Sequence, residues 1–202
     1  MKKRLLIHIC CAPDTTVAVE RLTQSWDIEG YFFNPNIHPR EEYERRRGAL
    51  ETLAEITGLP FIEVEYGTQM WFEAIKGLED EPEKGRRCEV CIGERLRATA
   101  RAAVARGFDA FSAVFTVSPH KDVEMINRLG ETAGKEYGIE YLPTNLKKQD
   151  GFRRSVELTR LHGIYRQDYC GCEYSRSRNR GRPASAGPEP EDQSPRKKPA
   201  SD

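Results

Sequence analysis

Long apolar runs and a net charge are what this sequence of 202 residues most clearly lacks. It has no stretch of about 20 consecutive apolar residues, the length that a transmembrane helix needs. Lys2-Lys3-Arg4 followed by Leu5-Leu6-Ile7 imitates the start of a signal peptide, but the apolar run is short and no small-residue cleavage site follows it. We therefore expect a first β-strand here, no membrane association, and a cytoplasmic protein.

The charges cancel overall but are unevenly distributed. With 32 basic and 32 acidic residues, total charge gives no reason to expect a nucleic-acid partner. Residues 175–202 carry seven basic and four acidic side chains, are rich in Pro and Ser, and contain no aliphatic side chain larger than Ala. Such a segment cannot bury a core. We expect one folded domain over residues 1–174 and a disordered Arg/Pro/Ser-rich tail over residues 175–202.

Strand and helix patterns alternate along the proposed domain. The expected strands cover residues 4–9, 28–33, 61–64, 109–115 and 139–142, and the expected helices cover residues 14–24, 40–57, 69–76, 91–106, 118–137 and 150–161. Asp14 is the expected N-cap of the first helix, and Ser118-Pro119 is the expected start of the fifth. This alternation is typical of an α/β fold, a parallel sheet with flanking helices, which binds ligands at the carboxyl ends of its strands.

The six cysteines require an explanation other than disulfides, which are rare in the cytoplasm. They form three pairs: Cys10 with Cys11, Cys88 with Cys91, and Cys170 with Cys172. A structural zinc site commonly uses two C-x-x-C pairs, and one pair here has that spacing. Six thiolates exceed a single tetrahedral site, whereas four fit a 4Fe–4S cluster and leave two beside it. Asp14 can complete a second metal centre with the spare pair, or the spare thiolates are redox-active without a metal.

The histidines divide into structural and chemical candidates. His8 alternates with Ile7 and Ile9 on the first strand, which favours a core or supporting position over a metal ligand. His38 and His120 follow Pro-containing turns, so together with Asp14 they are our candidate catalytic residues. His162 follows a predicted helix and is expected to be a helix-end residue.

Five segments resemble one family, the QueH-type epoxyqueuosine reductases. They are Leu6–Asp14 (LIHICCAPD), Gly30–Arg47 (GYFFNPNIHPREEYERRR), Cys88–Leu96 (CEVCIGERL), Phe115–Asn127 (FTVSPHKDVEMIN) and Asp150–Ser175 (DGFRRSVELTRLHGIYRQDYCGCEYS). The resemblance implies a single domain similar to the adenine-nucleotide α-hydrolase (HUP-like, Rossmann-like) fold. It also implies a cobalamin-independent oxidoreductase that reduces epoxyqueuosine in tRNA to queuosine, the last step of queuosine biosynthesis.

The resemblance further implies a 4Fe–4S cluster beside a single metal ion, which we expect to be iron. Cys88 and Cys91 are the expected cluster ligands. The other two are drawn from the remaining four cysteines: Cys10, Cys11, Cys170 and Cys172. The pair left over would hold the second metal with Asp14, a position at which some relatives carry a further cysteine. The electrons come from a donor that the sequence does not identify.

Recognition of tRNA requires basic and aromatic side chains around the site, because a loop base must be splayed out to react. The candidates for phosphate contacts are Arg45, Arg46, Arg47, Lys147, Lys148, Arg153 and Arg154. The candidates for stacking are Tyr43, Phe152 and Tyr165. For the arginines at 45–47, a solvated helix face is the alternative, since glutamates lie at helical spacing from them.

Two other functions are compatible with these patterns. A cluster-dependent tRNA sulfurtransferase on a related fold is one, but the first strand is followed by Cys-Cys-Ala-Pro-Asp and not by an ATP-binding Ser-Gly-Gly-x-Asp-Ser loop. A non-enzymatic, zinc-stabilised RNA-binding module is the other, and metal analysis would separate it from an iron–sulfur enzyme. A small electron carrier would not need this many cysteines.

Overall fold

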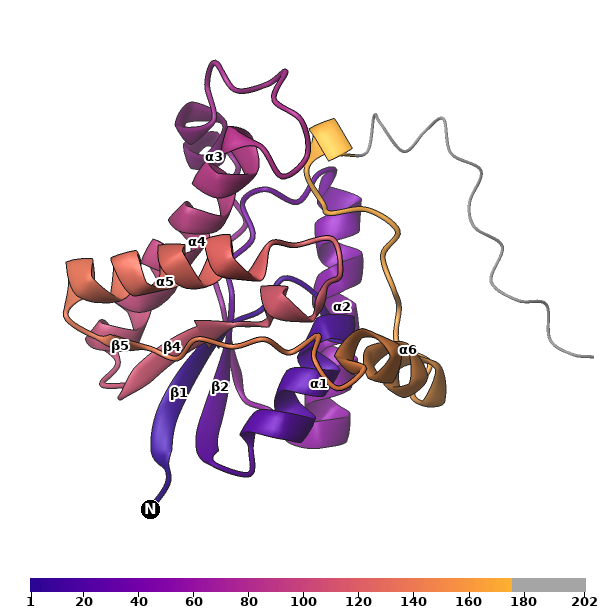
Figure 1. Ribbon diagram of the computed structural model, residues 1–202. Coiled ribbons are helices and arrows are strands. Elements are labelled where there is room, and N and C mark those ends of the chain that lie inside the picture. The colour runs from indigo at the N-terminus through magenta and orange to yellow at the C-terminus, as the bar shows by residue number, and fades with distance from the viewer. Residues whose placement is uncertain (176–202) are drawn as a thin grey trace, which may run out of the picture.

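The computed structural model describes residues 1–175, which form one α/β domain (Figure 1). Five parallel strands make a single sheet in the order β3-β2-β1-β4-β5. They are β1 (Lys3–His8), β2 (Trp26–Phe32), β3 (Phe61–Glu63), β4 (Ala110–Ala113) and β5 (Glu140–Tyr141). The chain moves outward from β1 through β2 to β3 and then returns to place β4 on the other side of β1. The crevice between the carboxyl ends of β1 and β4 is therefore the topological switch point, where sheets of this kind bind ligands.

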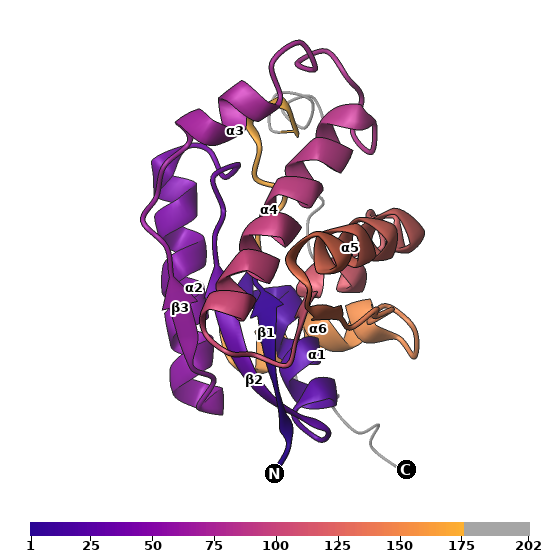
Figure 2. The same ribbon diagram turned by 90° about the vertical axis from the view of Figure 1, so that its left-hand side faces the viewer.

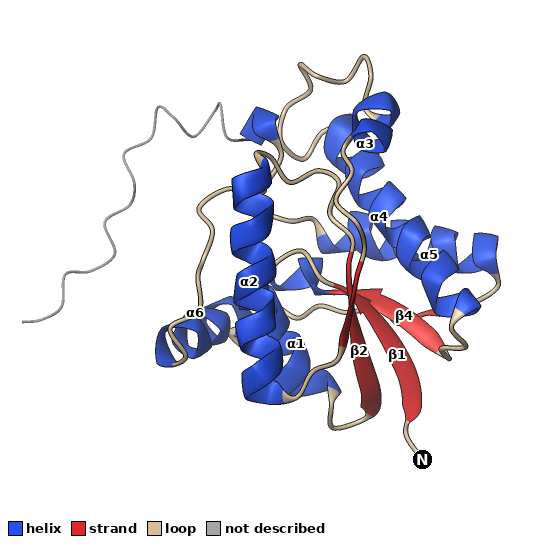
Figure 3. Ribbon diagram, turned by 180° about the vertical axis from the view of Figure 1, so that it is seen from behind, coloured by secondary structure: helices blue, strands red, loops and turns tan. Residues whose placement is uncertain are grey.

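Helices cover both faces of the sheet, as the alternating pattern predicts. They are α1 (Ala12–Leu22), α2 (Arg40–Thr57), α3 (Gln69–Ala74), α4 (Arg86–Ala105), α5 (Val123–Tyr137) and α6 (Gly151–Leu161). Figures 2 and 3 show α4 and α5 on one side of the sheet and α1, α2 and α6 on the other. Leu5 and Ile7 of β1 pack toward α1 and α2, whereas Leu6 packs toward α4 and α5. A strand buried on both faces reads as a continuous apolar run, which is why residues 5–7 are all aliphatic.

Three helix starts differ from the sequence prediction. Cys11, not Asp14, is the N-cap of α1, so Asp14 lies inside the first turn of that helix. Helix α4 begins at Arg86 and so includes both Cys88 and Cys91. Helix α5 begins at Val123 and not at Ser118-Pro119, because the Asp122 carboxylate caps it by accepting hydrogen bonds from the backbone N–H groups of Glu124 and Met125, at 2.9 and 3.1 Å.

The segment between β4 and α5 also differs from expectation. The fourth strand ends at Ala113, and Val114–Val117 form a buried 3₁₀ turn. The turn and the loop after it carry the chain across the carboxyl edge of the sheet, where Lys121 enters the site described below.

The predicted tail lies outside the described residues except for Ser175. That residue is buried, and its Oγ donates a hydrogen bond to the Cys172 carbonyl at 2.8 Å, so it belongs to the folded part. Within residues 1–175, none of the helices combines the length and the apolar character that crossing a bilayer requires.

Candidate metal centre

All three cysteine pairs lie at the carboxyl edge of the sheet. Cys10 and Cys11 follow β1 directly and lead into α1. Cys88 and Cys91 lie in the first two turns of α4, where a spacing of three residues places both on one face of the helix. Cys170 and Cys172 lie in the segment after α6. The pairs separate into two groups of different geometry, one compact and one wide.

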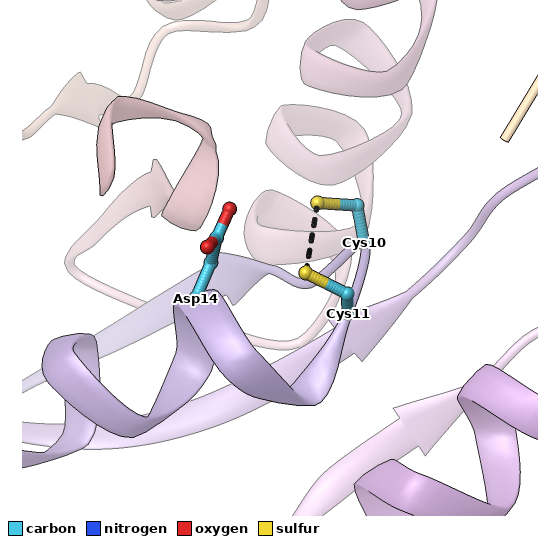
Figure 4. Close-up of side chains that lie close together, drawn as sticks. All are labelled: Cys10, Cys11 and Asp14. Carbon is cyan, nitrogen blue, oxygen red and sulfur yellow. Dashed lines mark hydrogen bonds between the residues drawn. The ribbon is translucent and has the colours of Figure 1, made fainter. Parts of the chain in front are cut away.

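The compact group consists of Cys10, Cys11 and Asp14, whose ligand atoms all lie within 4.8 Å of one another. The two sulfur atoms are 3.9 Å apart. Figure 4 shows both sulfurs and the Asp14 carboxylate directed toward a common point. This geometry depends on where α1 begins: because the helix is capped by Cys11, the Asp14 side chain faces the sulfurs and does not cap the helix.

The electrostatics of the compact group disfavour the charged forms of Cys11 and Asp14. The hydrogen bond with Cys10, together with burial, holds the pKa of the Cys11 thiol well above its ordinary value. Burial and the nearby Cys11 hold the pKa of the Asp14 carboxyl well above its usual range, against the opposing charges of Arg166 and Lys121. Metal ligands of these types bind in the deprotonated form, so a cation here would displace protons.

The wide group consists of the other four cysteines, which line one small pocket. Its remaining lining residues are Asn36, Trp71, Arg87, Ile92, Arg95 and Lys121. Among the described residues, no three of the sulfurs of Cys88, Cys91, Cys170 and Cys172 come within 4.8 Å of one another. The four thiols thus surround a space instead of converging on a point.

Cations in the wall of the cavity contact its thiols directly. Lys121 Nζ lies 3.0 Å from the Cys170 sulfur, and Arg95 Nη2 lies 3.4 Å from the Cys91 sulfur. Burial alone raises the pKa of the Cys170 thiol, but Lys121 and Arg95 together hold it below its ordinary value. Burial dominates at Cys88 and Cys91, where it raises the pKa of each thiol.

The two groups are electrostatically adjacent. Arg95 is buried. Its positive charge interacts electrostatically with Cys10 of the compact group and with Cys91 and Cys170 of the wide group. Lys121 likewise acts on both Asp14 and Cys170. These two cations therefore lie between the groups and stabilise negative charge in both.

Arg46 fixes the segment that carries the last cysteine pair. Its guanidinium donates to the Cys170 carbonyl at 3.2 Å, to the Tyr169 carbonyl at 3.0 Å and to the Glu42 carboxylate at 2.8 Å. Both Arg46 and Glu42 are buried. Gly171 has a φ of 118°, and a Cβ there would lie 3.1 Å from Arg46 Nη1, so this close approach requires glycine.

The predicted RNA contacts fall into three kinds of environment. Arg46 has no side free for a phosphate, and Tyr43 is buried with its hydroxyl donating to the Val64 carbonyl, so neither fits the expected role. Arg47 pairs with three glutamates, and Arg154 pairs with Glu20 and Glu157. The other candidates lie on or near the surface: Arg45, Lys147, Lys148, Phe152, Arg153 and Tyr165.

The candidate catalytic histidines are not brought together with Asp14. His38 packs against the rings of Trp71 and Phe72, at 5.2 and 4.9 Å, beside the wide group. His120 is exposed on the loop that carries Lys121. His8 is fully buried, with a ring nitrogen 2.9 Å from the Phe33 carbonyl, and burial lowers its pKa to about 3, which agrees with a core position.

Sequence reasoning missed several residues around the two groups: Asn36, Trp71, Arg87, Arg95, Lys121 and Arg166. Most of them lie inside the segments that carry the family resemblance, but nothing in their spacing shows which side chains turn inward. A larger open groove, between Lys2, Trp26, Pro60 and neighbouring residues, lies at the amino ends of the strands. Its lining contains no cysteine and no histidine, so our candidate site is the smaller pocket.

Comparison with known proteins shows the family of this chain. Residues 5–178 match the family model for epoxyqueuosine reductase QueH. An epoxyqueuosine reductase QueH from Streptococcus pyogenes serotype M1 is 44% identical over 181 residues, which cover 87% of this chain and 71% of the relative. The one from Acinetobacter baylyi is 42% identical over 182 residues, covering 89% and 84%. The one from Thermotoga maritima is 39% identical over 174 residues, covering 85% and 89%. The chain therefore belongs to the epoxyqueuosine reductase QueH family and is an oxidoreductase of queuosine biosynthesis.

Proposed function

We propose that this chain reduces epoxyqueuosine in tRNA to queuosine with a 4Fe–4S cluster and an adjacent single metal ion. The cluster ligands are the four cysteines of the wide group: Cys88, Cys91, Cys170 and Cys172. The single metal ion is held by the compact group: Cys10, Cys11 and Asp14. The observation that carries this proposal is the adjacency of two thiol groups of different size in a chain of this family.

The wide group fits a cluster better than it fits a single ion. Four thiolates around one zinc ion lie about 3.8 Å from one another, given a Zn–S distance of about 2.3 Å and tetrahedral geometry. Among the described residues, no three sulfurs of the wide group lie within 4.8 Å of one another, although all four cysteines line the same pocket. In a 4Fe–4S cluster each thiolate binds a different iron, so the four sulfurs are expected to stand farther apart.

The compact group fits a single ion. Its sulfur–sulfur separation of 3.9 Å is close to the edge of a tetrahedron of ligands around one metal. Two thiolates and a carboxylate are suitable ligands for iron or zinc. Three protein ligands leave a position open for a substrate oxygen, as in catalytic metal sites generally. We propose iron as the resident metal, since the site adjoins a redox cluster.

Conversion of the epoxide to an alkene consumes two electrons and two protons and releases water. When bound, the cluster supplies electrons singly and the metal ion supplies a Lewis acid for the epoxide oxygen. The positive charges of Arg95 and Lys121 would offset part of the negative charge that thiolates bring to this buried site. His120 is the exposed candidate for proton delivery, on the same loop as Lys121, while His38 is placed to support the wall of the wide group.

The tRNA contacts are proposed at a surface where basic and aromatic side chains alternate. The Arg45 guanidinium lies 5.5 Å from the centre of the Tyr165 ring, and the Arg166 guanidinium lies 4.8 Å from that of Phe152. Arg166 also acts on Asp14, which links this surface to the compact group. Such stacked cations and rings suit a single-stranded loop, with Lys147, Lys148 and Arg153 available for phosphates.

The test is metal analysis followed by an assay on the natural substrate. The anaerobically purified chain should contain about four sulfides and about five irons, and with dithionite as reductant it should convert epoxyqueuosine-containing tRNA to queuosine-containing tRNA. Omission of dithionite is the control. Zinc without sulfide, persisting after anaerobic reconstitution with iron and sulfide, would contradict the proposal.

A further inference from the structure

Three side chains in the wall of the wide cavity hold buried polar atoms that have no partner among the described residues. They are the amide of Asn36, the indole N–H of Trp71 and the Nε of Arg87. Asn36 and Trp71 are each only 1% exposed. Leaving a buried donor without an acceptor destabilises a protein, so an acceptor is expected wherever several such donors face one space.

Asn36 differs in this respect from a chemically identical neighbour. Asn34 is also buried, but its Nδ2 donates to the Ile9 carbonyl at 2.8 Å. Both amide atoms of Asn36 are unpartnered, so an N–H is free whichever way the amide is oriented. The backbone around it is fixed, because His38 N–H donates to the Gly171 carbonyl at 2.8 Å and the Tyr66 hydroxyl donates to the Ile37 carbonyl at 2.8 Å.

Trp71 is equally fixed beside the cysteines. It packs with Ile75, Cys91 and Cys172 in one buried cluster, and its ring contacts those of His38 and Phe72. Its N–H lies near the Cys91 thiol and favours the thiolate form, but it forms no hydrogen bond with the sulfur among the described residues. The protein therefore holds two neutral donors rigidly at a cavity whose thiols do not satisfy them.

We propose that Asn36 Nδ2 and Trp71 Nε1 donate hydrogen bonds to sulfur atoms of the cluster in the wide cavity and thereby raise its reduction potential. The inference rests on the proposed function, because it needs the cluster as the acceptor. Reduction adds negative charge to the cluster, and donors directed at its sulfurs stabilise that added charge. Asn36 and Trp71 are positioning residues, since they tune the electron source and do not touch the substrate.

The experiment is a redox titration of the cluster, followed by electron paramagnetic resonance, in the reconstituted full chain. Asn36→Leu replaces the amide with an apolar group of similar size, and Trp71→Phe removes the N–H while retaining a ring. Each should shift the midpoint potential of the cluster to a lower value than in the wild type, with iron and sulfide contents unchanged. Trp26→Phe is the matched control, because it makes the same chemical change at the opposite edge of the sheet, and its potential should equal that of the wild type.

The sign of the change in midpoint potential shows whether a variant has lost a hydrogen bond to the cluster or has opened the cavity to water. Water admitted to the cavity would stabilise the more negative reduced cluster and raise the potential, whereas a lost hydrogen bond lowers it. An unchanged or raised potential in both Asn36→Leu and Trp71→Phe would overturn the inference while leaving the proposed function intact. Absence of a cluster in the reconstituted wild type would overturn both. If Asn36→Leu fails to assemble the cluster, the potential of Trp71→Phe decides alone.

Discussion

The compact and wide groups place the same side chain in two different geometries. In the compact group two adjacent cysteines follow a strand and meet a carboxylate one helical turn later, so three ligand atoms lie within 4.8 Å. In the wide group one pair comes from a helix and the other from a distant segment, and the four cysteines line one pocket without three of their sulfurs lying within 4.8 Å of one another. The number of cysteines therefore says less about a metal site than the elements that carry them.

The groups differ in charge as well as in size. Cys11 and Asp14 have raised pKa values, for reasons that begin with the Cys10 hydrogen bond and with burial respectively. Cys170 has a lowered pKa despite its burial, because Lys121 and Arg95 adjoin it. Deprotonation is thus disfavoured at Cys11 and Asp14 of the compact group and favoured at Cys170 of the wide group.

The largest expected effect is on the iron and sulfide content of variants that lack one cysteine ligand. Such variants test whether each group binds its metal independently of the other. Cys91→Ser should abolish acid-labile sulfide, because a 4Fe–4S cluster with three thiolate ligands in a buried cavity lacks its fourth support. Cys11→Ser should retain about four sulfides per chain and lose only the additional iron. Chemical iron and sulfide analysis measures both. Loss of sulfide in Cys11→Ser to the same extent would show that the two groups form one ligand set.

The next effect concerns the carboxylate that distinguishes the compact group. Asp14→Asn should lower kcat by more than about a hundredfold, since a Lewis acid contributes several kcal/mol and each 1.36 kcal/mol is tenfold in rate. Sulfide content and the visible spectrum of the cluster should not change. Asp150→Asn, an exposed position before α6, serves as the matched control and should keep full activity. Equal activity of the two variants in single-turnover assays would remove Asp14 from the site.

The third effect, on stability, tests whether Arg46 holds in place the segment that carries Cys170 and Cys172. Arg46→Lys keeps the charge opposite Glu42 but loses contacts to the Tyr169 and Cys170 carbonyls. We expect a loss of about 2–4 kcal/mol in the free energy of unfolding, or roughly 5–15 °C in Tm, and faster release of iron. Arg47→Lys, next to it on α2 but paired only with surface glutamates, should change stability by less than about 0.5 kcal/mol. Thermal unfolding curves that coincide for the two variants would show that Arg46 does not hold this segment.

The smallest expected effect is on tRNA binding, after removal of one exposed arginine of α6. Arg153 is 77% exposed and has one pairing partner, Glu157. Arg153→Ala should weaken tRNA binding a few-fold and reduce the slope of log K against log salt by about 0.7–0.9. Arg106→Ala removes an exposed arginine at the opposite edge of the sheet and should leave the slope unchanged. A salt titration in which both variants follow the wild type would exclude Arg153 from the phosphate contacts.

Much of the fold follows from local patterns. The bounds of α2 match the prediction because Gly58, in the left-handed conformation with a φ of 71°, ends a charged amphipathic helix. The parallel sheet follows from strand–helix alternation, and it places the three cysteine pairs at one edge. Helix starts were predicted less well, because Asp14 and Asp122 are equally good caps by composition and only the second acts as one.

The division of the cysteines into two groups does not follow from spacing. It depends on the path of residues 162–172, which long-range hydrogen bonds to Arg46 determine. The three consecutive arginines of α2 illustrate the same limit. A helix turns about 100° per residue, so one member of the run faces inward, and only the burial of Glu42 identifies it as Arg46. Unpartnered donors such as the Asn36 amide are visible only once all the neighbouring acceptors are placed.

The hydrogen bonds between Arg46 and the Tyr169–Cys170 carbonyls also have a consequence for synthesis. A ribosome delivers the chain from its N-terminus, so the complete compact group emerges long before the second half of the wide group. Until residues 169–172 arrive, the guanidinium that will fix them lacks two of its acceptors, and the cavity has only two of its four thiols. If the wide group holds the proposed cluster, its assembly therefore has to wait until residues 169–172 have been synthesised, whereas the ligands of the compact group are complete much earlier in the nascent chain.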